Sequence, residues 1–382
     1  MTRVARLSIV LTIAFVGGLT GVMPASAQPA WQGVERIVAV GDVHGDYARF
    51  TEVLRAAGVI DDDDRWVGGE THLVQTGDAI DRGPDTQRVL DVLMRLEEEA
   101  SDAGGMVHAL LGNHETMNIL GDLRFVAPAD YESFRSPDSV RLRNLLFERH
   151  AELLRARAAP DAEPVEVDDA YRERWESTRP LGYVERLYAF GPDGQYGRWL
   201  RQHDTIVQIN DTLFLHGGIS TAYADVPLDQ INDRVRQELE DDSLLAGGMI
   251  QDQAGPLWYR GLATDEEALV APHVDAVLAR HDARRIVVGH TVQPAIMPRV
   301  DGRIVLIDVG LGRAYGGPPA CLLIEDGRAF ALHRGEKIAL PAAAGEPVVA
   351  YLSRAAALDP APSPLLPLIE KLETQLAPAT VP

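Results

Sequence analysis

The sequence contains almost no cysteine. Cys321 is the only one in 382 residues, so no disulfide can form within the chain, and a zinc site built from several thiolates is excluded. Cys321 stands in the apolar run Ala320–Ile324, where a small core side chain is expected rather than a nucleophile. The ligands of any metal site are therefore expected to be nitrogen and oxygen atoms.

The chain also has a deficit of positive charge. Its formal net charge is −21, which argues against nucleic acid as a partner. Solubility is a sufficient explanation for such an acidic composition. The acidic run Asp61–Asp64 lacks the alternating spacing of a calcium loop and predicts a solvated turn.

Long apolar runs are absent, apart from Leu7–Met23. Arg3 and Arg6 precede this run, and Ala25-Ser26-Ala27 follows it with small residues at positions −3 and −1 of a cleavage site. This pattern predicts that residues 1–27 are a secretory signal peptide of the short form typical of bacteria, and that the protein is exported, with the periplasm as its expected location. An uncleaved anchor is the alternative, for which the run is short. No membrane partner is expected after cleavage.

The first half of the chain repeats a strand, a polar loop and a helix. Strands are predicted at Glu35–Val40, Thr71–Thr76 and Met106–Leu111, and helices at Tyr47–Ala57 and Pro84–Glu99. Polar residues follow each strand. Functional sites of open α/β sheets collect at that edge.

The repeat then lapses, and we expect a helical insertion at about residues 120–200, near the mouth of the site. Its role is either packing or that of a lid that selects substrates. A charged amphipathic helix is predicted over Ser139–Ala158. Its apolar stripe is Leu142, Leu145, Leu146, Leu153 and Leu154.

The second half again predicts alternating strands and helices. We expect one domain over residues 28–340 and a Pro/Ala-rich tail over 341–382, with a possible helix at Leu365–Leu376. The predicted strands are Thr205–Ile209, Thr212–Leu215, Arg285–Val288, Arg303–Ile307, Ala320–Ile324 and Arg328–Leu332, and the predicted helices are Leu228–Leu239 and Pro272–His281.

Six polar residues lie at the ends of predicted strands, each next to a glycine. Mixed nitrogen and oxygen ligands of this kind suit Mn, Fe, Zn or Co. Six are too many for one catalytic ion with an open position, but they suit two ions that share a carboxylate. These residues are Asp42, His44, Asp78, Asn113, His216 and His290.

Other polar residues lack this context. His108 lies inside a strand and is expected in the core, and no role is assigned to Asp308. Surface or packing positions are expected for His72, His203, His273 and His281.

Four blocks occur in a recognisable order, and they resemble the signatures of the phosphoprotein phosphatase branch of the calcineurin-like metallophosphoesterases. The likeness extends over Ile37–Leu332, and the insertion and signal resemble the bacterial Shewanella-like type. It implies an α/β fold of two mixed sheets packed as a sandwich between helices. The blocks are Gly41-Asp42-Val43-His44-Gly45, Gly77-Asp78-Ala79-Ile80-Asp81-Arg82-Gly83, Gly112-Asn113-His114-Glu115 and His216-Gly217-Gly218.

The resemblance also implies a role for each site residue. Asp42 and His44 would bind the first metal ion, Asp78 would bridge, and the second ion would be bound by Asn113, His216 and His290. His114 would protonate the leaving group and Asp81 would orient His114. Arg82 would bind the phosphate, with Arg260 and Tyr315 as further candidates.

The implied activity is metal-dependent hydrolysis of phosphomonoesters by a hydroxide that bridges the two ions. The expected substrate is a protein phosphorylated on serine, threonine or tyrosine, or a small phosphomonoester. A dinucleoside tetraphosphate hydrolase has similar motifs, but export argues against its cytosolic substrate. A non-catalytic binding module would show a broken ligand, and none is visible.

Overall fold

The structure is a computed structural model, and it describes residues 30–157 and 166–377. The predicted signal peptide lies outside the described residues. One six-stranded sheet has the order β12-β11-β10-β2-β3-β4, in which β2, β3 and β4 are parallel. Its strands are β2 (Arg36–Val40), β3 (His72–Gln75), β4 (Met106–Ala109), β10 (Ala320–Glu325), β11 (Arg328–His333) and β12 (Glu336–Ala339).

The other six-stranded sheet has the order β1-β5-β6-β7-β9-β8. Here β6, β7 and β9 are parallel, while β5 and β8 pair antiparallel with their neighbours β6 and β9. Its strands are β1 (Ala30–Trp31), β5 (Ile206–Ile209), β6 (Thr212–Leu215), β7 (Arg285–Val288), β8 (Met297–Arg299) and β9 (Ile304–Leu306).

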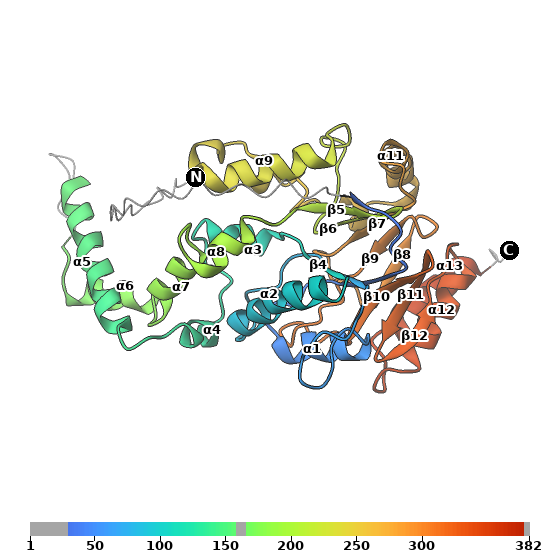
Figure 1. Cartoon of the computed structure of the whole chain (residues 1–382), viewed down its shortest axis with the longest axis horizontal. Coiled ribbons are helices and arrows are strands. Elements are labelled where there is room, and N and C mark those ends of the chain that lie inside the picture. Colours follow the sequence, from blue (N-terminus) through green and yellow to red (C-terminus); the bar gives the residue numbers. More distant parts are fainter. Residues whose placement is uncertain (1–29, 158–165, 378–382) are drawn as a thin grey trace, which may run out of the picture.

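The two sheets pack together, and helices cover their outer faces (Figure 1). Strands β3, β6 and β7 are buried along their whole length, because parallel strands in such a sandwich are covered on both faces. The predicted fold is therefore confirmed. Helices α1 (Tyr47–Ala56) and α2 (Thr86–Asp102) connect the strands β2, β3 and β4 of the first sheet. Three α-helices lie in the chain between β6 and β7 of the second sheet, namely α9 (Leu228–Glu240), α10 (Gly261–Thr264) and α11 (Glu267–Arg280).

Two helices begin more than one residue away from the predicted start. Helix α2 begins at Thr86 rather than Pro84, because the chain first turns through Arg82, whose φ is +63°. Helix α11 begins five residues before Pro272 and contains that proline. Proline lacks an N–H and fits a first turn best, so its position suggested the start of the helix.

The insertion is a series of helices that projects from the sandwich (Figure 1). Its longest helix packs through Phe147 and Ala151, whereas Leu145 in the predicted apolar stripe is 52% exposed. The predicted stripe is thus only partly confirmed, since its other four leucines are half-buried. The buried contact of the helix with its neighbour is between the Phe147 and Trp175 rings, 5.2 Å apart. The helices are α4 (Pro128–Ser133), α5 (Ser139–Arg157), α6 (Asp169–Ser177), α7 (Tyr183–Phe190) and α8 (Gln195–Leu200).

The Pro/Ala-rich stretch carries two helices, α12 (Glu346–Ala356) and α13 (Leu366–Leu376). The second coincides with the predicted helix, and the first was not predicted. Tyr351 and Leu352 of α12 are buried, and the Tyr351 hydroxyl donates a hydrogen bond to the Ile296 carbonyl at 2.8 Å. Helix α12 therefore packs as part of the folded unit.

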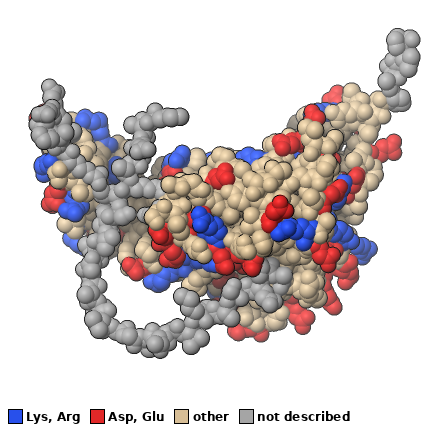
Figure 2. Space-filling model, turned by 90° about the horizontal axis from the view of Figure 1, so that it is seen from above, with Lys and Arg blue, Asp and Glu red and all other residues tan. Residues whose placement is uncertain are grey.

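Acidic and basic side chains are interspersed on the face shown in Figure 2. No helix within the described ranges is long and apolar enough to cross a membrane.

We predict that Leu352→Ala lowers the free energy of unfolding by about 2–5 kcal/mol, because it leaves a cavity at a fully buried site. Leu366→Ala is the matched control, since Leu366 is 50% exposed, and a change within about 0.5 kcal/mol is expected for it. Denaturant unfolding followed by circular dichroism measures both. Equal effects of the two substitutions would contradict the packing of α12 described above.

Candidate metal centre

The residues that follow five strands meet at one edge of the sandwich. Asp42, Asp78 and Asn113 follow the parallel strands β2, β3 and β4, while His216 and His290 follow β6 and β7. All five side chains are at most 5% exposed. The six predicted metal ligands, which also include His44, are thus brought together from both sheets.

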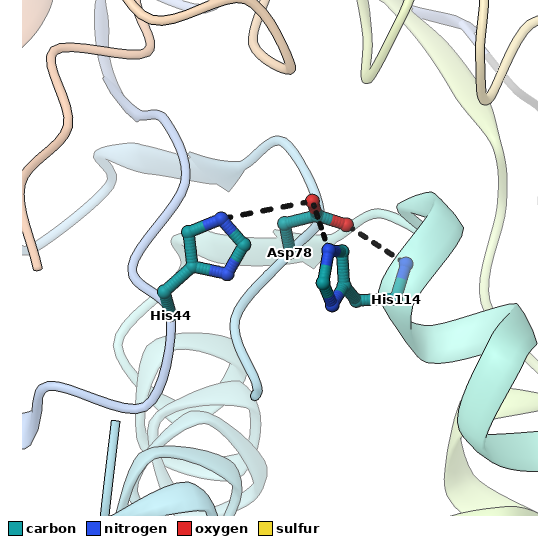
Figure 3. Close-up of side chains that lie close together, drawn as sticks. All are labelled: His44, Asp78 and His114. Atoms are coloured by element: carbon teal, nitrogen blue, oxygen red, sulfur yellow. Dashed lines mark hydrogen bonds and ion pairs between the residues drawn. The ribbon is translucent and has the colours of Figure 1, made fainter. Parts of the chain in front are cut away.

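The first cluster consists of His44, Asp78 and His114 (Figure 3). His44 Nε2 and His114 Nε2 lie 3.9 and 3.7 Å from the same oxygen, Asp78 Oδ2. Asp42 Oδ2 lies 3.9 Å from His44 Nε2. His44 Nδ1 is 3.1 Å from the Ile80 carbonyl, so Nδ1 donates there and Nε2 is free to bind a metal ion.

The second cluster consists of Asp78, His216 and His290. His216 Nε2 lies 3.3 Å from Asp78 Oδ1 and 2.9 Å from Asn113 Oδ1. The other His216 nitrogen contacts the Thr76 carbonyl at 3.0 Å. Asp78 therefore offers one oxygen to each cluster, which is the arrangement of a bridging carboxylate.

The loops of the site have unusual backbone angles. His44, Asp78, Asp81, Arg82 and His290 have φ values between +50° and +68°. Each such residue costs roughly 1–2 kcal/mol relative to right-handed backbone, and such residues cluster at functional sites.

Asp42 and His44 are brought together by a turn after β2. Strand β2 ends at Val40, and His44 has a φ of +50°. A turn, and not the alternation of side chains along a strand, therefore brings the carboxylate of Asp42 and the imidazole of His44 together.

Gly289 shows how closely the two sheets approach each other at the site. A Cβ atom at this position would lie 2.5 Å from Asp42 Oδ1 and 3.0 Å from Thr76 Oγ1. Asp42 Oδ1 also accepts the His290 N–H at 3.0 Å. Only glycine leaves room for this contact between β2 and β7.

Asp308 is a buried neighbour of Asp42, and it was missed as a site residue. Burial, together with repulsion by Asp308 and Asp78, raises the pKa of Asp42 well above its ordinary value. Asp308 Oδ2 is buried without a hydrogen-bond partner among the described residues. Several buried carboxylates, with imidazoles as their neighbours, fit bound cations, because cations would compensate their charge.

Glu115 is a second residue whose role was not foreseen. Its carboxylate accepts the backbone N–H groups of Asp78, Ala79 and Gly112 at 2.8–2.9 Å. Burial and the charge of Asp78 raise the pKa of Glu115 to about 7. Glu115 thereby holds the loop after β3 against the start of α3 (Asn113–Ile119).

His114 contacts a carboxylate through its other nitrogen. Its Nδ1 lies 2.7 Å from Asp81 Oδ2. Burial alone would lower the pKa of His114, but the charge of Asp78 and the hydrogen bond to Asp81 raise it. Two residues that sequence reasoning missed, Asn118 and Arg186, also donate to Asp81.

The predicted phosphate-binding residues surround this pair of clusters. Arg82 lies over the rings of Phe125 and Tyr315, at 4.7 and 5.4 Å, and its Nε has no hydrogen-bond partner in the described part of the chain. Tyr315, 42% exposed, is 5.4 Å from the His44 ring. Arg260 is exposed at the rim and donates to the His290 carbonyl.

Residues 35–294 match the calcineurin-like phosphoesterase family. This chain is a calcineurin-like metallophosphoesterase. The resemblance inferred from the four sequence blocks is confirmed, and the enzyme is a hydrolase of phosphoric esters.

Relatives of this metallophosphoesterase include Shewanella-like protein phosphatase 2 of Arabidopsis thaliana, 31% identical over 78% of this chain and 77% of the relative. Shewanella-like protein phosphatase 1 of Plasmodium berghei is 27% identical over 78% of this chain and 73% of that relative. The crystal structure of a cold-active protein-tyrosine phosphatase of a psychrophilic Shewanella species is 30% identical, covers 82% of each chain and superimposes with a TM-score of 0.62. The chain is therefore a metal-dependent phosphatase, and its two clusters are positioned for a dinuclear metal site.

The five histidines that were predicted to be core, surface or packing residues lie outside the two clusters. His108 is buried as expected, and it contacts His72, also buried, at 3.0 Å. The other three are partly buried: His203 contacts Glu97 at 2.7 Å, His273 contacts the Ile219 carbonyl at 2.7 Å, and His281 caps α11.

We predict that Asp78→Asn lowers the metal content of both positions, because both clusters use this carboxylate. His44→Asn is expected to lower the metal content of only one position, so that about one of two ions per chain is retained. Elemental analysis after loading with Mn and desalting measures the content. His273→Asn is the control and is expected to keep the full content. Equal metal loss in Asp78→Asn and His44→Asn would argue against a shared carboxylate.

Proposed function

We propose that this protein is a phosphomonoester hydrolase that acts on phosphorylated serine, threonine or tyrosine of proteins. One observation carries the proposal. His44, His216 and His290 each direct one ring nitrogen at a backbone carbonyl, whereas His114 directs Nδ1 at the Asp81 carboxylate. The pKa values separate the roles. Burial lowers the pKa of His44 and of His290, which suits neutral metal ligands, whereas the charge of Asp78 and the hydrogen bond to Asp81 raise the pKa of His114 against the effect of burial, which suits a proton carrier.

In this proposal Asp42, His44 and Asp78 would hold one ion, and Asp78, Asn113, His216 and His290 would hold the other. When bound, the two ions would neutralise phosphoryl oxygens and provide a nucleophilic water near neutral pH. Manganese, iron and zinc suit this donor set.

Asp81 keeps the proton of His114 on Nδ1, and the second proton of the imidazolium, on Nε2, is the one given to the leaving oxygen. Arg82 binds two phosphoryl oxygens, because its guanidinium presents paired donors. Arg260 and Tyr315 contribute to phosphate binding from the rim of the site.

The part of the substrate beyond the phosphoryl group is proposed to lie in a pocket of about 330 Å³ beside α3. Met117, Phe125 and Trp258 are among its lining residues. The Phe125 ring is 5.0 Å from His114, and the Trp258 carbonyl contacts His290. The pocket thus adjoins both clusters. Relatives named as protein phosphatases and a protein-tyrosine phosphatase support a phosphoprotein substrate.

A substrate panel tests this function. The metal-stripped protein is expected to be inactive, and Mn, Fe, Zn, Co or Mg added back separately identifies the active ion. The restored enzyme should hydrolyse phosphotyrosine and phosphoserine peptides and p-nitrophenyl phosphate. Turnover of a dinucleoside tetraphosphate alone would refute the proposal in favour of a dinucleotide hydrolase.

We propose further that residues 1–27 direct export to the periplasm and are removed. When the full chain is produced in a Gram-negative bacterium, the periplasmic protein is expected to begin at Gln28, as measured by intact mass and N-terminal sequencing. A variant with Ala25 and Ala27 replaced by arginine should remain uncleaved. If the protein is recovered from the cytoplasm and still carries residues 1–27, the proposal is contradicted.

A further inference from the structure

Arg186 is an arginine with no exposed surface, contributed by the helical insertion. It lies on α7, more than a hundred residues after Asp81 in the sequence, and its side chain is 0% exposed. Burial of a guanidinium is costly unless charges and hydrogen bonds satisfy it. The partners of Arg186 therefore indicate what the burial achieves.

Each of the three guanidinium nitrogens of Arg186 has a partner. Nη2 donates to Asp81 Oδ1 and to Asn118 Oδ1, both at 2.9 Å. Nε donates to Asn118 Oδ1 at 3.2 Å, and Nη1 pairs with the buried Asp130. The guanidinium also lies over the Phe134 and Phe190 rings, at 5.1 and 4.9 Å. These contacts leave the group a single orientation.

The contacts converge on Asp81. Its Oδ2 faces His114 Nδ1 at 2.7 Å, and Asn118 Nδ2 donates to both of its oxygens at 3.0 Å. Because Arg186 donates a hydrogen bond to Oδ1, the Asp81 carboxylate cannot rotate without breaking several hydrogen bonds. A fixed anion on Nδ1 directs the His114 Nε2 proton toward the site.

The anchoring of α7 explains how an insertion residue reaches this point. Helix α7 packs against α3, the helix that carries His114 and Asn118. Gly182 precedes α7 with a φ of +92°, and a Cβ there would lie 1.9 Å from the Tyr131 carbonyl oxygen of α4. Asp130 is also on α4. Helices α4 and α7 of the insertion are thus packed against each other, and α7 against α3.

We propose that Arg186 is a positioning residue that acts through Asp81 on His114, so that the insertion completes the apparatus that protonates the leaving group. The inference rests on the proposed function. In the step concerned, the phosphorus–oxygen bond to the leaving group breaks, its electron pair stays on that oxygen, and the proton on His114 Nε2 neutralises it. The nucleophilic water supplies the oxygen of the inorganic phosphate product.

The test compares leaving groups. The double variant Arg186→Met with Asp130→Asn removes both members of the buried ion pair and avoids leaving Asp130 as an uncompensated charge. Its kcat is expected to fall about 10- to 100-fold on phenyl phosphate, because misplacement of a catalytic group by about 1 Å costs this much. The kcat on dinitrophenyl phosphate, whose leaving group needs no proton, and both KM values should remain close to those of the parent. Circular dichroism confirms folding.

Two single variants make the result specific. Arg141→Met removes an arginine of the same insertion whose side chain is 60% exposed, and it should retain the activity of the parent on both substrates. His114→Asn removes the acid itself and should show a larger loss with the same dependence on the leaving group.

Loss of equal size on both substrates in the double variant, or no loss, would overturn the positioning role while leaving the proposed function intact, provided that His114→Asn behaves as expected. If His114→Asn itself shows no dependence on the leaving group, the acid assignment and the inference both fail.

Discussion

The carboxylate of Asp78 lies between histidines from both sheets. One oxygen faces His44 and His114, at 3.9 and 3.7 Å, and the other faces His216 at 3.3 Å. Although burial favours protonation of Asp78, the charges of His114 and His216 and a hydrogen bond to His216 hold its pKa well below the ordinary value. The loops around the site are arranged so that this one anion can be shared. The left-handed turns, the contact at Gly289 and the hydrogen bonds of Glu115 all serve that arrangement.

The histidines around Asp78 acquire different chemistry from their second contacts. Burial lowers the pKa of His44 to about 4 and that of His290 to about 2, which suits neutral metal ligands. Burial would also lower the pKa of His114, but the charge of Asp78 and the hydrogen bond to Asp81 raise it. Asp81 in turn is held by Asn118 and, in our proposal, is positioned by Arg186. A residue of the projecting insertion is thereby connected to the proton donor through two hydrogen bonds.

Much of the site could be predicted because its residues follow strands in the sequence. The carboxyl ends of parallel strands share an edge, so Asp42, Asp78 and Asn113 were expected close together, and they are. The contact between Asp42 and His44 could not be predicted from strand periodicity, since it depends on the left-handed turn at His44. In the leucine stripe of α5, Leu145 is exposed, because contacts with a neighbouring helix, and not with the core, decide which residues of α5 are buried.

The sequence by itself determined the family, the order of the strands and helices, and the set of candidate ligands, because these depend on local patterns of apolar residues, glycines and polar strand ends. Tertiary structure alone decided which oxygen of Asp78 faces which histidine, that Asp308 stands behind Asp42, and that Arg186 reaches Asp81. These contacts join segments from both sheets and the insertion. No local periodicity encodes them, because they depend on how separately formed elements pack against one another.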